Sequence, residues 1–171
     1  AGTAVGASGG LVQFQNTTTA GDANFAINGA SMADGALGGQ VIFKHTATAA
    51  NATFTANGGT VSGAEGGHVG FSDTATAGNS TLIANEGTNG GMGGRISFGV
   101  FAAGGTARVK VYGNGSLTYS ASTLSIGSIE GDGIVLLGGS SALTVGGNNL
   151  STLFSGEVQE SGINGSLVKT G

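Results

Sequence analysis

Histidine, serine and aspartate side chains occur at matching positions of two similar stretches, where they could form a hydrolytic centre. Ser72 and Asp73 follow one apolar segment, and His45 follows the equivalent segment 28 residues before Asp73. Nucleophilic hydrolysis needs a base oriented toward the nucleophile, beside an oxyanion site. Because nothing nearby in the sequence suggests a pocket, we interpret His45 and Asp73 as a solvated pair on neighbouring repeats. His68, at another repeat position, is interpreted as plain surface.

Carboxylates are the second group that could act on a substrate or hold a metal ion. Glycoside cleavage needs two carboxylates at short range, but the acidic residues are spread along the chain. Glu130 and Asp132 form the closest pair, and their glycine-rich bend would bind a cation weakly at most. The sequence has no cysteine, and it does not match the calcium-binding nonapeptide Gly-Gly-x-Gly-x-Asp. We therefore expect no catalytic residues, no metal and no cofactor, and we do not expect an enzyme.

Threonines form the sharpest surface motif, Thr-x-Thr, which recurs at one repeat position. Its threonines are Thr17, Thr19, Thr46, Thr48, Thr74 and Thr76. Ranks of outward threonines on a flat face are typical of ice-binding β-helices. The alternative is a corner in which the hydroxyls bond their own backbone. The corner is favoured, because the motif lies beside Gly, Ala and Asn and gives way to Phe101-Ala102-Ala103 in the next repeat.

The charge balance argues against nucleic acid as a partner. The chain has five Lys and Arg residues against nine Asp and Glu, which gives a net charge of −4. Recognition of a phosphate backbone requires a basic footprint that so few cations do not provide. The longest apolar run, residues 134–137, is far too short to cross a membrane as a helix. We expect neither nucleic-acid binding nor membrane insertion of this segment.

The candidate side chains lie on a repeat in which a Gly-Gly pair is followed by Val or Ile and then by Phe. The pairs begin at Gly9, Gly38, Gly66 and Gly93, so the repeat lengths are 29, 28 and 27 residues. The phenylalanines are Phe14, Phe43, Phe71 and Phe98. Constant apolar residues alternate with variable ones, which predicts a half-buried strand in each repeat. A regular period of this length is typical of stacked units that share one core.

A second strand is predicted later in each repeat. Its central inward residues are Phe25, Phe54, Leu82 and Val109. An asparagine follows it in every repeat: Asn28, Asn57, Asn85 and Asn114. Asparagine tolerates the left-handed backbone conformation of a corner, and stacked asparagine side chains can bond one another. We expect these four residues to form a turn ladder.

Identical residues one repeat apart favour stacking of coils over pairing within a hairpin. Winding each repeat into one coil places its Phe above the Phe of the preceding coil, with coils about 4.8 Å apart. We therefore predict an all-β fold, a parallel β-helix (β-solenoid) of roughly six coils without separate domains, over residues 1–171. Residues 1–120 hold the long repeats, and residues 121–171 hold shorter strands that predict a coil of different cross-section. The core ladder comprises Phe14, Phe43, Phe71, Phe98, Phe25, Phe54, Leu82 and Val109.

The last third of the chain carries the stretches LTVGGNNLSTLFSGEVQESG (residues 143–162) and GSLVKTG (residues 165–171). Upstream lie TATAGNSTLIANEG (residues 74–87) and GGTVSGAEGG (residues 58–67). The first two resemble the autotransporter-associated β-strand repeat family of large bacterial surface and secreted proteins, and the others resemble Gly-rich repeats that commonly precede it. The resemblance implies a right-handed β-helix exposed outside the cell, without catalytic residues.

Together these patterns predict a non-enzymatic structural module of a bacterial secreted or cell-surface protein: an adhesin shaft, a spacer or a self-assembling fibre. Residues 1–7 match residues 58–64, so we expect a piece that begins and ends in mid-repeat. Coil ends of this kind would associate end to end with another copy. The alternative is an adhesin module that binds glycans or surfaces, and ice binding is less favoured. The outward residues of that alternative are Gln40, His68, Arg95, Arg108 and Lys110.

Overall fold

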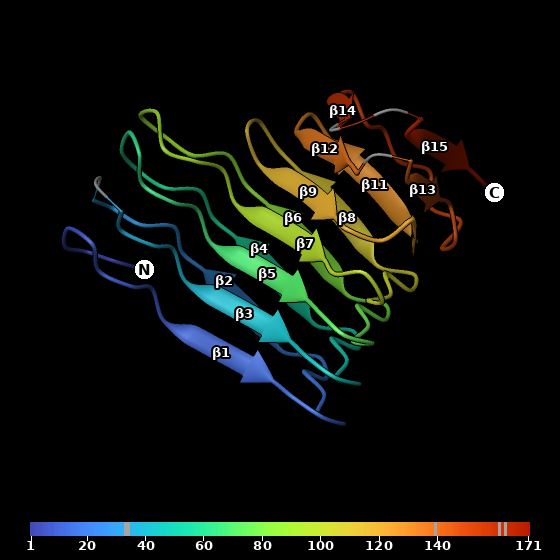
Figure 1. Ribbon diagram of the computed structural model, residues 1–171, viewed down its shortest axis with the longest axis horizontal. Coiled ribbons are helices and arrows are strands. Elements are labelled where there is room, and N and C mark those ends of the chain that lie inside the picture. The colour runs from blue at the N-terminus through green and yellow to red at the C-terminus, as the bar shows by residue number, and fades with distance from the viewer. Residues whose placement is uncertain (33–34, 139, 161, 163) are drawn as a thin grey trace.

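The computed structural model describes residues 1–32, 35–138, 140–160, 162 and 164–171, and the regular structure of these residues is entirely β. Every strand pair in this part of the chain is parallel. The chain winds as a coil whose strands stack along one axis (Figure 1). The predicted all-β parallel β-solenoid is confirmed.

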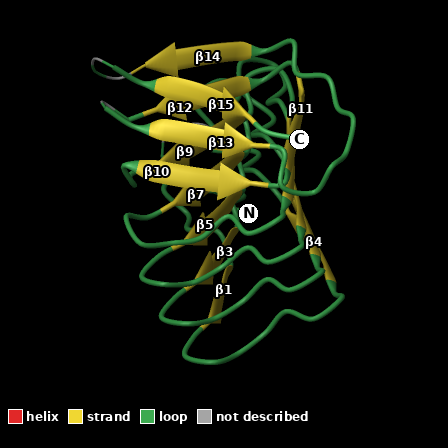
Figure 2. Cartoon of the chain, turned by 90° about the vertical axis from the view of Figure 1, so that its right-hand side faces the viewer, coloured by secondary structure: helices red, strands yellow, loops and turns green. Residues whose placement is uncertain are grey.

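The described strands form three sheets. The first sheet has seven strands, in the order β1 (Leu11–Phe14), β3 (Gln40–Phe43), β5 (His68–Phe71), β7 (Arg95–Phe98), β9 (Ser116–Tyr119), β12 (Ile134–Leu137) and β14 (Glu157–Glu160). The second has five, in the order β2 (Asn24–Ile27), β4 (Thr53–Ala56), β6 (Thr81–Ala84), β8 (Arg108–Val111) and β11 (Ser128–Gly131). The third has β10 (Thr123–Ile126), β13 (Ala142–Val145) and β15 (Ser166–Lys169). Figure 2 shows the third sheet in front, joined to the C-terminal half of the coil.

Successive coils lie in register, one repeat apart. Val41 of β3 pairs with Val69 of β5, and Phe43 pairs with Phe71. The next step pairs Phe71 with Phe98 of β7. A slip of one residue would turn every apolar side chain of a strand outward, so the constant Val, Ile and Phe positions fix this register.

Stacked aromatic rings fill the core of the first coils. The rings of Phe14, Phe43, Phe71 and Phe98 follow one another with centroid separations of 4.6, 4.9 and 4.8 Å. On the second sheet, the rings of Phe25 and Phe54 stack at 4.9 Å, and fully buried Leu82 and Val109 continue their column. Phe14 and Phe25 are only partly buried because they lie in the first coil, which is covered on one side.

A glycine-rich segment leaves each of the first three coils between its second-sheet strand and the next strand of the first sheet. We call these three segments together the arm. Its described residues are 29–32 and 35–38, 58–66, and 86–93. The arm is closed at its base by backbone bonds, in which the N–H of Gly39 donates to the carbonyl of Asn28 and the N–H of Gly67 to that of Asn57. Ala30, Ala36 and Ala64 form a small separate core inside the arm. In Figure 1 the arm projects from one side of the stack as long loops.

The cross-section of the coil changes after β8. The arm is absent there, and a tight turn replaces it, in which the N–H of Gly115 donates to the carbonyl of Tyr112. At the opposite corner the chain straightens into β10. This strand lies directly against the corner of the preceding coil, because a Cβ on Gly104 would overlap the backbone of Ser125. The corner of the long repeats thus continues as the third sheet.

The predicted turn ladder is wrong at Asn114. Side-chain amides of Asn85, Asn57 and Asn28 bond one another in sequence, at 2.9 Å each. Asn114 instead lies beside Gly93, at the position of the first glycine of the Gly-Gly pair, and its side chain bonds the arm at Gly87 and Gly91. The reason is the missing arm: the loop after β8 is shorter, so an asparagine near its end falls in a different column.

Candidate functional site

The residues that suggested a hydrolytic centre build a corner. His45 and Asp73 occupy the same position of successive coils with φ of 57° and 54°, and Asn16 precedes them with φ of 56°. The N–H of Asn16 donates to Nδ1 of His45 at 3.4 Å, and the N–H of His45 donates to Oδ2 of Asp73 at 2.9 Å. The hydroxyl of Ser72 donates to the carbonyl of Phe43 at 3.2 Å. These side chains therefore bond backbone of the preceding coil, and none of the three activates another.

The threonine motif serves the same corner. Thr46 and Thr74 donate their hydroxyls to backbone carbonyls of the preceding coil, at 2.9 and 3.0 Å. Thr19, Thr48 and Thr76 accept from the N–H two residues further on, at 3.0 to 3.1 Å. Thr17 occupies the same repeat position as Thr46 and Thr74, in the first coil, and is exposed. This is the arrangement of a corner whose hydroxyls bond backbone, and it favours that interpretation of the motif.

Glu130 and Asp132 lie close in sequence but have separate partners. Glu130 accepts from Arg108 and from Lys110, both at 2.8 Å, and the hydrogen bond from Arg108 holds the pKa of its carboxyl below the usual range. Asp132 accepts from the N–H of Gly113 at 3.0 Å. The pair therefore forms no joint site. In the part of the chain that the structure describes, no three His, Cys, Asp or Glu residues gather as metal ligands would.

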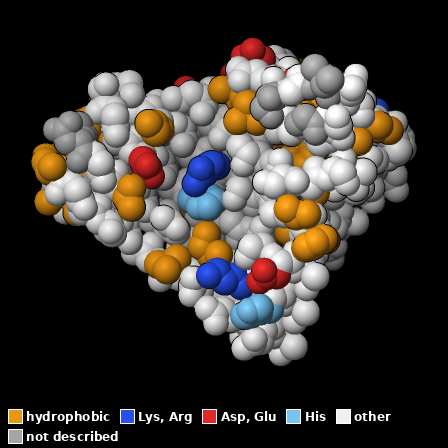
Figure 3. Space-filling model, viewed as in Figure 1, with side chains coloured by type: hydrophobic (Ala, Val, Ile, Leu, Met, Phe, Trp, Pro, Cys, Tyr) orange, Lys and Arg blue, Asp and Glu red, His pale blue; other side chains and the backbone are white. Residues whose placement is uncertain are grey.

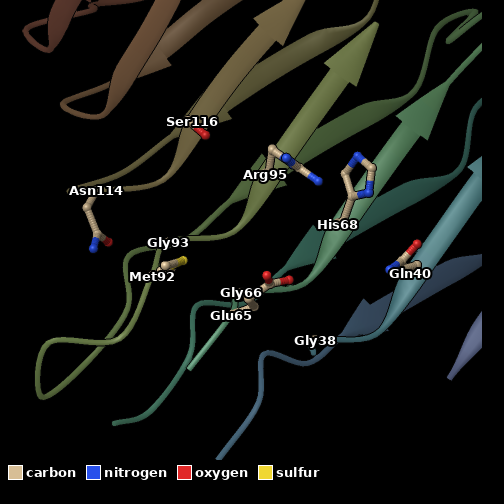
Figure 4. A pocket seen from close by; sticks show the side chains of 10 residues that line it. All are labelled: Gly38, Gln40, Glu65, Gly66, His68, Met92, Gly93, Arg95, Asn114 and Ser116. Atoms are coloured by element: carbon tan, nitrogen blue, oxygen red, sulfur yellow. The ribbon is translucent and has the colours of Figure 1, made fainter. Parts of the chain in front are cut away.

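A hollow of about 250 Å³ lies where the outer face of the first sheet meets the arm. One row of its lining comes from the sheet, one residue from each of four adjacent coils: Gln40, His68, Arg95 and Ser116. The opposite wall comes from the arm and includes Glu65 and Met92. Figure 3 shows a basic side chain and a histidine together in the hollowed part of this face, and Figure 4 shows how the lining side chains are arranged.

Glycines at the base of the arm shape this hollow. A Cβ on Gly38 would overlap the carbonyl of Gly66, and a Cβ on Gly66 would overlap that of Gly93. A Cβ on Gly93 would in turn overlap the carbonyl of Asn114. Only glycine allows the backbones of successive coils to approach so closely, so the first glycine of each pair keeps the arm against the sheet.

His68 is neutral near pH 7. Burial, with a smaller contribution from the charge of Arg95, lowers the pKa of its imidazole to about 4. Nε2 of His68 lies 2.7 Å from the hydroxyl of Ser97, which can donate or accept according to the tautomer of the ring. The histidine therefore presents hydrogen-bonding capacity without charge.

The side chain of Arg95 has no hydrogen bond or ion pair with the described part of the chain, and the residue is exposed at the hollow. By contrast, Arg108 and Lys110 pair with Glu130, and Lys169 donates to the carbonyls of Thr170 and Gly171. The side chain of Lys44 also has no such partner in the described chain, but it does not line the hollow. Arg95 is therefore the free positive charge of this surface.

Sequence reasoning placed Gln40, His68 and Arg95 on the outward face but missed the hollow. The missing information was the arm, whose wall brings Glu65 and Met92 opposite this row. The signal was present as the constant first glycine of each pair, whose function is visible only once the coils are stacked.

No protein-family model, curated protein or solved structure matches the chain. Among the residues that the structure describes, no helix is long and apolar enough to span a membrane. The function must therefore be argued from the stacked coils and the surfaces that they present.

Proposed function

We propose that this chain is a non-enzymatic structural module of a bacterial secreted or cell-surface protein, which acts as a shaft, a spacer or a self-assembling fibre. The observation that carries the proposal is the in-register stacking of coils, in which four aromatic rings follow one another at 4.6 to 4.9 Å through the core of the first coils. The residues that could have done acid–base or nucleophilic chemistry bond backbone or one another at the corners and on the second sheet.

Polar ladders on the outside repeat the stacking of the core. The amides of Asn85, Asn57 and Asn28 bond in sequence on one side of the stack. At another corner Asn79 donates to Asn51, which donates to Asp22. In a stack of this kind each coil contributes its own contacts and one interface with its neighbour, so stability grows with coil number. A rod with these properties transmits force and sets distance, as a shaft or spacer must.

The open faces of the terminal coils support end-to-end association. β1 and β14 each have one strand partner within the described chain. Val12 of the first coil is 43% exposed, and Leu167 of the last coil is 49% exposed, although both occupy columns that are buried elsewhere. Unpaired strand edges with apolar side chains template pairing with another chain. A contact between unlike ends does not close on itself and generates a filament.

The resemblance of residues 143–162 and 165–171 to the autotransporter-associated β-strand repeat family supports a location outside the cell, as does the absence of cysteine from the sequence. We place the module at the bacterial cell surface or in secreted material on this basis. Fractionation of the producing bacterium with an antibody against the chain tests the location, and a signal confined to the cytoplasm would overturn it.

Sedimentation velocity across a concentration series tests the self-assembly. The wild-type chain is expected to form species that lengthen with concentration. Val12→Lys and Leu167→Lys each place a charge on one end face and are expected to restrict the chain to monomers. Thr17→Lys, on the side of the coil, is the matched control and is expected to assemble like the wild type. A wild-type chain that stays monomeric throughout the series would overturn end-to-end assembly.

A further inference from the structure

We propose that the hollow between the first sheet and the arm binds one uronate unit of an acidic saccharide, with the sugar carboxylate on Arg95. This site goes beyond the structural role proposed above and does not depend on it, because the residues involved lie on the side of the coil and not at its ends.

The charge of the site comes from Arg95. Its guanidinium is exposed at the hollow and has no hydrogen-bonding or ionic partner in the described chain. A guanidinium binds a carboxylate through two parallel N–H···O bonds, and such charge-assisted bonds are about twice as strong as neutral ones. The free guanidinium therefore favours an anionic ligand, and a carboxylate matches its two parallel N–H donors.

The rest of the sheet wall is neutral and polar. Gln40 has both a donor and an acceptor, Ser116 has a hydroxyl, and His68 is uncharged near pH 7 because burial lowers its pKa to about 4. These groups follow one another along the axis in adjacent coils, with Arg95 in the same row. A row of neutral donors and acceptors around one cation fits a ligand with hydroxyls around one carboxylate, which is the chemistry of a uronate.

The residues of the arm that line the hollow further restrict which ligands can bind. Glu65 presents a carboxylate, which accepts hydrogen bonds from sugar hydroxyls but repels a densely charged ligand. The net charge of −4 acts in the same direction. A volume of about 250 Å³ lies below the roughly 300–1,000 Å³ of pockets for drug-sized ligands, so the hollow suits one sugar unit at a time.

Titration of the ¹⁵N-labelled chain with a glucuronosyl-glucose disaccharide, followed by NMR, tests the site; all chains in this experiment carry Val12→Lys, which lies outside the hollow and is expected to keep them monomeric. The expected result is saturable shifts of the backbone signals of Gln40, His68 and Arg95, with the signals of the second sheet unmoved. The glucosyl-glucose disaccharide of the same linkage and sodium acetate serve as comparison ligands, and both are expected to bind at least about tenfold more weakly.

Two variants assign the binding to Arg95. Arg95→Gln is expected to weaken binding of the acidic disaccharide about tenfold or more. Lys44→Gln removes the other cationic side chain that has no partner in the described chain, outside the hollow, and is expected to bind like the wild type. Unchanged melting temperatures show that both variants are folded.

Three results would overturn the proposal: no saturable shifts with the acidic disaccharide, equal binding of the neutral disaccharide, or equal losses in the two variants. Acetate that binds as tightly as the disaccharide would also overturn it, because the site would then recognise a carboxylate without its sugar. None of these results bears on end-to-end assembly, which is measured separately by sedimentation.

Discussion

The phenyl rings of Phe43 and Phe71 lie with their centroids 4.9 Å apart and their planes within 10° of parallel. The two residues are 28 positions apart in the sequence and are paired across β3 and β5. Phe43 also meets Phe54 of the second sheet edge-on at 5.5 Å. Phe43 also stacks on Phe14 at 4.6 Å, so one ring contacts both neighbouring coils along the axis and the second sheet across the core.

Removing one ring from this column should destabilise the fold strongly. Phe71→Ala is expected to lower the free energy of unfolding by about 3–5 kcal/mol, because the ring is buried and its neighbours cannot collapse into the space. For a chain of this size the melting temperature would fall on the order of 10 °C. Phe101→Ala is the matched control, since Phe101 is 75% exposed, and it should change the melting temperature little. Similar small shifts in both variants would count against a stacked core.

The close approach of backbones at the base of the arm can be tested with alanine. Gly66→Ala should be strongly destabilising, because its Cβ would overlap the carbonyl of Gly93 in the next coil. Gly10→Ala is the control: a Cβ there meets nothing within 4 Å and requires no positive φ, so this change should be neutral or stabilise by up to about 1 kcal/mol. Urea unfolding measures the free energy of unfolding of both variants. If Gly10→Ala were less stable than Gly66→Ala, the backbones at the base of the arm would not be in close contact at Gly66.

The asparagine ladder should contribute measurably to stability. Asn57 donates to Asn28 and accepts from Asn85, each at 2.9 Å. Asn57→Ala is expected to cost about 1–2 kcal/mol, since both partners lose a hydrogen bond. Asn24→Ala, on the exposed outer face of β2, should cost little because no hydrogen bond holds its side chain within the described chain. Equal costs would mean that the ladder adds nothing beyond strand propensity.

His68 should make the fold sensitive to mild acid. Its pKa is about 4 in the folded chain and 6.5 in the unfolded chain, so between these values the unfolded chain binds the extra proton. Stability from this group is therefore fully present above pH 6.5 and is lost as the pH falls toward 4. Melting temperatures at pH 7 and pH 5 should differ more for the wild type than for His68→Gln. The same pH dependence in both would show that other groups are responsible.

The strands and the aromatic column could be predicted because the alternation of Val, Ile and Phe acts locally and repeats. The prediction for Asn114 is wrong because it assumes that the asparagine after each second-sheet strand lies above the asparagine of the preceding coil. After β8 the arm is missing, so Asn114 lies beside Gly93 instead. The hollow could not be foreseen because its walls depend on contacts between glycine backbones of different coils. His68 was interpreted as plain surface, but neighbours on the same sheet contact its ring: a Cβ on Gly70 would come within 3.1 Å of the ring, and Nε2 lies 2.7 Å from the hydroxyl of Ser97.

Site-specific cross-linking between two copies tests the end-to-end account most directly, because the native chain has no cysteine. Continuing the register of the first sheet from one copy to the next would set Gln13 of β1 beside Gln159 of β14. A mixture of Gln13→Cys and Gln159→Cys chains is expected to form the mixed disulfide dimer in preference to either symmetric dimer. A mixture of Gln13→Cys and Asn89→Cys, at the arm, is the control. No preference for the Gln13–Gln159 pair over this control would contradict the account.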